Sequence, residues 1–139
     1  MRIVRSIPLV LVLASTLTAT AQDDVPKTIA ESVGGALKHT QARFLEIAEA
    51  MPETKYSFIP TAGAFKDARS FAEQVKHVAC ANIAFFNEIE GKTPPLHCER
   101  GGPAPAKTKA ELIKYLHESF YYGNTVLATI NPQNAVDRV

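Results

Sequence analysis

The sequence of 139 residues lacks the short motifs that mark several common enzyme classes. It has no G-x-S-x-G elbow, which argues against an α/β-hydrolase nucleophile. Its glycine pairs, Gly34-Gly35 and Gly101-Gly102, lack the strand-turn-helix context of a phosphate-binding loop. It also has no internal repeats and no low-complexity tracts. The function therefore has to be sought in the pattern of helices and in a few histidines and cysteines.

An excess of charge of either sign is also missing, since the formal net charge is +1. The one basic cluster, formed by Lys107, Lys109 and Lys114, has no interleaved aromatic residues and is most simply a solvated helix face. We therefore expect no nucleic-acid partner.

The first 21 residues have the pattern of a signal peptide. Arg2 and Arg5 precede an apolar run over residues 7–17, and Ala19-Thr20-Ala21 has the small-x-small form of a cleavage site. The run is shorter than the ~20 residues that a membrane span needs. We expect cleavage between Ala21 and Gln22, export to the periplasm or the extracellular space, and no stable membrane anchor afterwards. An uncleaved anchor is the alternative.

The rest of the chain, residues 22–139, is long enough for one small core, and its pattern is purely helical. Apolar residues recur at helical spacing over residues 28–50 and 71–90, and again from residue 108 to the Asn131-Pro132 stop. S-x-x-E and T-x-x-E capping boxes predict that the second and third helices start after Ser70 and Thr108. Residues 91–106 hold four prolines and three glycines and predict a long crossover connection.

The predicted core stripes are as follows. The first helix uses Ile29, Val33, Ala36, Leu37, Thr40, Phe44, Ile47, Ala48 and Met51; the second uses Phe71, Val75, Val78, Asn82, Phe85, Phe86 and Ile89; the third uses Leu112, Leu116, Phe120, Gly123, Leu127 and Ile130. Tyr56, Phe58 and Phe65 in the first connection are expected to plug the end of the bundle. Gly34-Gly35 either admits a close neighbour or marks a kink.

Two cysteines in an exported chain predict one disulfide, between Cys80 and Cys98. Cys98 lies in the connection, which is long enough to fold back to Cys80 on the second helix. The alternative is a reactive or metal-binding thiol, although Lys76 is the sole nearby cation that could lower its pKa.

The order of features along the chain resembles that of a known family. A long first helix ends at Met51-Pro52 and is followed by Tyr56, Phe58, Pro60, Ser70, Phe71, Gln74, His77 and Asn82. The order resembles the DinB-like four-helix-bundle superfamily over roughly residues 28–130. In that family the histidine matching His77 is the first ligand of a divalent metal. The other two ligands form an H-x-x-x-H pair on a fourth helix, and this sequence contains no such pair. The resemblance implies an all-α, incomplete four-helix bundle in which the C-terminal helix is missing.

The number of available ligands limits the divalent-metal site that the sequence can form. A catalytic divalent site in a bundle normally takes three protein side chains. The chain has four histidines: His39, His77, His97 and His117. A site built from His39, His77 and His117 is conceivable, but His77 lies on a flank that suits either a cleft or solvent. We expect zinc, nickel or a similar ion to bind well only if further ligands are supplied.

Two hypotheses on function follow. The resemblance implies a relative of metal-dependent thiol S-transferases and of a maleylpyruvate isomerase, with an incomplete metal site. The alternative is a noncatalytic helical module for binding or dimerisation. Three amphipathic helices without a fourth would leave an apolar groove exposed, and we expect a second copy or a partner helix to cover it.

Overall fold

The computed structural model describes residues 28–61 and 68–136. Within these ranges there are three α-helices and no strand: α1 (Ile29–Ala50), α2 (Phe71–Ile89) and α3 (Lys109–Leu127). Two short 3-10 helices, η1 (Glu53–Lys55) and η2 (Cys98–Arg100), lie in the connections. The predicted all-α fold is confirmed. The predicted signal peptide with its Ala21-Gln22 cleavage site, and Phe65, lie outside the described residues.

Local capping signals account for the helix starts. Ser70 with Glu73 and Thr108 with Glu111 form the two predicted capping boxes, and Thr28 with Glu31 forms a third. Each cap of this kind contributes about 1 kcal/mol to helix stability. The backbone N–H groups of Ser70 and Thr108 hold the pKa values of Glu73 and Glu111 below their ordinary value.

The end of α3 was predicted less well. The helix stops at Leu127, before the Asn131-Pro132 stop. Thr129 N–H donates to the Val126 carbonyl, and Ile130 N–H donates to the Leu127 carbonyl. These three-residue spacings tighten the last turn and end the α-helical hydrogen bonding early.

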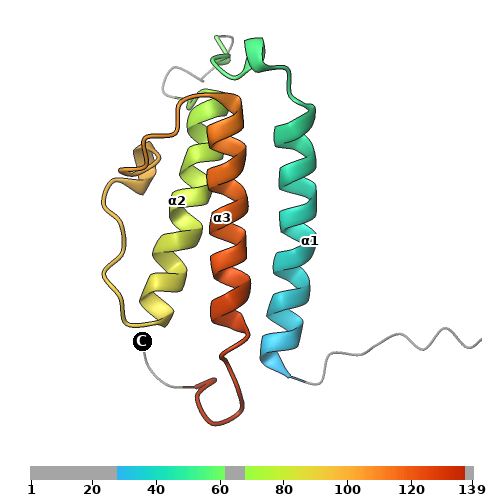
Figure 1. Ribbon diagram of the computed structural model, residues 1–139, viewed down its shortest axis with the longest axis vertical. Coiled ribbons are helices and arrows are strands. Elements are labelled where there is room, and N and C mark those ends of the chain that lie inside the picture. Colours follow the sequence, from blue (N-terminus) through green and yellow to red (C-terminus); the bar gives the residue numbers. More distant parts are fainter. Residues whose placement is uncertain (1–27, 62–67, 137–139) are drawn as a thin grey trace, which may run out of the picture.

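The crossover prediction is confirmed by the directions of the helices. α2 and α3 run the same way, α1 runs opposite to both, and the segment between α2 and α3 returns along the outer side of α2 (Figure 1). α2 and α1 each pack against α3 and scarcely contact one another. α3 is therefore the central helix of the described bundle.

The central position of α3 explains its burial. Five of its six predicted stripe residues are buried, and Ile130 is half-buried. Ser119 is also fully buried, and its hydroxyl donates to the Leu116 carbonyl (2.8 Å) while accepting from Asn82 Nδ2 (3.2 Å). This buried polar group is thus satisfied, as interiors require.

The predicted stripes of the outer helices were partly wrong. Ile29, Val33 and Ile47 on α1 are 62%, 47% and 54% exposed, and on α2 Phe85 is 64% and Ile89 41% exposed. The reason is that α1 and α2 are each covered by α3 on one side. At about 100° per residue, Ile29, Val33 and Ile47 lie on one flank of α1, roughly 60–160° away from its buried residues Leu45 and Ala48. We call these five residues the apolar flanks.

Two smaller interpretations also change. A Cβ built on Gly34 or Gly35 meets nothing within 4 Å, so this pair admits no close neighbour in the described structure. Lys109 is not simply solvated, because its Nζ donates to the carbonyls of Glu49 (2.7 Å) and Met51 (2.8 Å) and so caps the end of α1.

Of the aromatic residues predicted to plug the end of the bundle, Tyr56 does so. Tyr56 is buried, donates its hydroxyl proton to the Ala48 carbonyl (2.6 Å) and meets the Phe71 ring edge-on. Phe58 is instead 58% exposed, which is a correction. Its backbone carbonyl accepts from Phe71 N–H, so the backbone is docked on α2 while the ring faces outward.

Candidate functional site

His77 lies two turns into α2 and is half-buried beneath η2. Its Nδ1 is 2.6 Å from the Cys98 carbonyl oxygen. A carbonyl can only accept a hydrogen bond, so Nδ1 carries a proton, and in the neutral imidazole the lone pair is on Nε2. A histidine that binds a metal through one nitrogen usually donates the other N–H to a backbone carbonyl or a carboxylate in this way.

A disulfide holds that carbonyl in place. Cys80, fully buried on α2, is paired with Cys98, and their Cα atoms are 5.2 Å apart. The neighbouring carbonyl of Glu99 accepts a hydrogen bond from Arg69 Nε (2.8 Å). Two side chains therefore hold η2 beside α2: Cys80 through the disulfide, and Arg69, two residues before the helix, through the Glu99 carbonyl.

Two glycines after η2 allow the chain to pass close to α2. Gly101 and Gly102 have φ angles of 89° and 71°, which favour glycine. A Cβ on Gly101 would come within 2.7 Å of Lys76 Cδ, and a Cβ on Gly102 would overlap Cys80 Sγ. The chain can thus pass directly over α2 only because both positions lack a side chain.

The other histidines lie elsewhere. His39 is exposed on α1, and His97 is exposed with its Nδ1 3.5 Å from Glu99 Oε1. His117 Nε2 is 3.7 Å from Glu49 Oε1, in a pair that links α3 to α1. Among residues 28–61 and 68–136, no group of three or more His, Cys, Asp or Glu is placed to hold a metal ion. The conceivable trio of His39, His77 and His117 is not brought together there.

The model of the DinB superfamily matches residues 36–138, which is well over half of the chain. The chain belongs to the DinB superfamily. No curated protein and no solved structure gave a significant match. No helix in the described part of this DinB-superfamily chain is long and apolar enough to cross a membrane.

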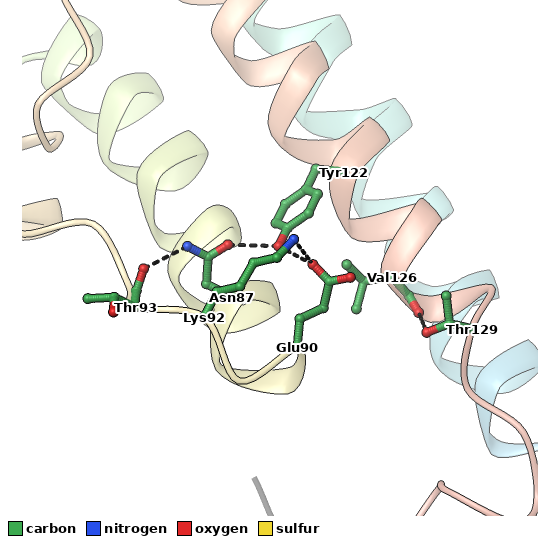
Figure 2. Close-up of polar contacts among 7 residues, drawn as sticks. All are labelled: Asn87, Glu90, Lys92, Thr93, Tyr122, Val126 and Thr129. Carbon is green, nitrogen blue, oxygen red and sulfur yellow. Dashed lines mark hydrogen bonds and ion pairs between the residues drawn. The ribbon is translucent and has the colours of Figure 1, made fainter.

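A polar network joins the far end of α2 to α3 in this DinB-superfamily bundle (Figure 2). The Tyr122 hydroxyl lies 2.6 Å from Glu90 Oε2 and 2.7 Å from Asn87 Oδ1, so its one proton serves either acceptor. The Glu90 carboxylate raises the pKa of Tyr122, and the phenol therefore stays protonated. Asn87 also donates to the Thr93 carbonyl, so the network anchors the start of the crossover.

A cavity of about 690 Å³ opens at the other end of α2. The described residues that line it come from the connection after α1 and from the first turn of α2, and Lys55, Phe58, Arg69 and Phe71 are among them. No feature of the sequence indicated this cavity. Lys55 and Arg69 are far apart in the chain, and no motif links them.

Proposed function

We propose that this chain is an exported member of the DinB superfamily related to the metal-dependent thiol S-transferases and isomerases, and that His77 is one ligand of its divalent metal. The observation that carries the proposal is the hydrogen bond from His77 Nδ1 to the Cys98 carbonyl. This hydrogen bond fixes the orientation of the ring and leaves Nε2 as the nitrogen that can bind a metal. Bound zinc in this class of site lowers the pKa of a thiol or of water.

The described residues alone do not make a catalytic metal site. They supply one oriented imidazole, whereas a catalytic zinc site takes three protein ligands. We therefore propose that the remaining ligands are supplied by another helix, one that carries the H-x-x-x-H pair that this sequence lacks.

Zinc titration tests this assignment. The chain over residues 22–139 is expected to show no submicromolar zinc site by isothermal titration calorimetry, because one imidazole competes poorly with water. Adding an amphipathic peptide with an H-x-x-x-H pair is expected to raise zinc affinity well above that of the peptide alone, by about tenfold or more.

His77→Ala should abolish that gain, whereas His39→Ala, at an exposed position on α1, should leave it intact. A submicromolar site in the chain alone that disappears in His77→Ala would show that the missing ligands lie within this sequence. A gain that survives His77→Ala would rule out His77 as a ligand.

A second candidate function is association through the apolar flanks, and their exposure favours it. The flank positions of α1 (Ile29, Val33 and Ile47) and of α2 (Phe85 and Ile89) are apolar side chains that are 41–64% exposed, so a contact between two copies there would bury apolar surface. We infer that a second copy of the chain covers the flanks.

Sedimentation velocity tests this association. The chain over residues 22–139 is expected to dimerise, and Phe85→Glu should weaken the dimer by about tenfold or more, because a charge would be buried in an apolar contact. Leu96→Glu is the matched control, since Leu96 is 72% exposed on the crossover and lies off the flanks. A monodisperse monomer that binds no hydrophobic dye would refute the association. A dimer weakened equally by both substitutions would place the contact elsewhere.

A further inference from the structure

The cavity of about 690 Å³ at the start of α2 has the size and the walls of a small-molecule site. Ligand pockets typically span roughly 300–1,000 Å³ and combine apolar walls with a few polar groups. Here Met51, Phe58, Pro60 and Phe71 supply apolar surface, and Lys55 and Arg69 supply positive charge. Phe58 keeps its ring 58% exposed while its backbone is docked on α2, so the ring is free to contact a ligand.

Both cations retain donors for an anion. In the part of the chain that the structure describes, no carboxylate forms an ion pair with either Lys55 or Arg69. Arg69 donates its Nε–H to the Glu99 carbonyl (2.8 Å). This hydrogen bond orients the guanidinium and leaves its terminal N–H groups available to an anion. A guanidinium held in this way matches the two oxygens of a carboxylate.

The backbone at the start of α2 does not compete for the same anion. Phe71 N–H donates to the Phe58 carbonyl, Ala72 N–H to the Tyr56 carbonyl (2.8 Å) and Glu73 N–H to Ser70 Oγ (3.2 Å). The N–H groups of the first turn are therefore already satisfied. Recognition of an anion falls to the two side chains at the cavity wall.

We propose that this cavity binds a small amphipathic carboxylate, with its apolar body against Phe58 and Phe71 and its carboxylate on Lys55 and Arg69. The site does not include His77, which is absent from the described lining. It therefore stands or fails independently of the metal assignment.

Binding of 2-naphthoate to the full exported chain, followed by isothermal titration calorimetry, tests the proposal. We expect saturable binding, and binding of the neutral isostere 2-naphthamide about tenfold or more weaker, since a hydrogen bond to a charged group is worth at least that factor. Lys55→Met should weaken 2-naphthoate by about tenfold and leave 2-naphthamide unchanged. Phe58→Ala should weaken both.

Two matched controls locate the site. Phe85→Ala removes a phenylalanine of similar exposure on the flank of α2, and Arg100→Gln removes an exposed cation outside the cavity; neither should change 2-naphthoate affinity. Equal affinities for 2-naphthoate and 2-naphthamide, no saturable binding, or a loss in Phe85→Ala in place of Phe58→Ala would each overturn the proposal. Far-ultraviolet circular dichroism confirms that each variant is folded.

Discussion

Replacing Cys98 with serine is expected to lower the free energy of unfolding by about 3 kcal/mol. The bridge from Cys80 closes a loop with a sequence separation of 18 residues, and its loss returns that loop's conformational freedom to the unfolded chain. It also removes the covalent link between η2 and α2 at a position where Cys80 is fully buried. Denaturant unfolding followed by circular dichroism measures the change.

Reduction provides the matched control. Adding a reductant should bring the natural chain down to the stability of Cys98→Ser and leave the variant unchanged. Thiol labelling of the denatured, unreduced protein should find no free cysteine. Stoichiometric labelling of both cysteines, or a variant as stable as the natural chain, would contradict the predicted bridge.

The disulfide also bears on the proposed metal ligand. The Cys98 carbonyl that accepts from His77 Nδ1 belongs to the residue that the bridge fastens. Once the bridge is removed, two hydrogen bonds still hold η2: His77 Nδ1 to the Cys98 carbonyl, and Arg69, just before α2, to the Glu99 carbonyl. His77 is therefore held by contacts made around the disulfide as well as by its own helix.

Local signals in the sequence predicted what local physics determines. Ser70 and Thr108 cap helices because each side chain and its partner glutamate lie three residues apart. Most of the core stripe of α3 was also predicted correctly, because two neighbours cover that helix and bury five of the six stripe residues. Periodicity reports that a face is apolar, and it does not report which neighbour covers it. Ile47 and Phe85 show the difference, since both fit a stripe and both are exposed.

The candidate sites were predictable only in part. The resemblance pointed to His77, but its partner is a backbone carbonyl, a group that every residue carries and that no side-chain pattern reveals. The cavity likewise depends on how the connection after α1 folds back onto α2. Lys55 and Arg69 both line it through tertiary structure, and neither belongs to a recognisable motif.

Replacing Gly123 with alanine is expected to destabilise the fold by about 1–3 kcal/mol, the range found for overpacked cores. A Cβ on Gly123 would overlap the ring of Phe86, with Cδ2 at 2.7 Å and Cζ at 2.8 Å. Phe86 is 8% exposed and meets Tyr122 edge-on, so its ring has little room to move. Gly123 therefore allows α2 and α3 to approach closely.

The expected loss of stability in Gly123→Ala is opposite in sign to the usual effect of this substitution. Alanine stabilises a helix by about 1 kcal/mol relative to glycine wherever space allows. Gly35→Ala on α1 is the matched control: its Cβ meets nothing within 4 Å, and a gain of up to about 1 kcal/mol is expected. Adding Phe86→Leu to Gly123→Ala should recover part of the loss, since the two changes share one contact. Denaturant unfolding of the three variants decides the matter. If Gly123→Ala and Gly35→Ala stabilised the protein alike, α2 and α3 could not be packed as closely as this structure places them.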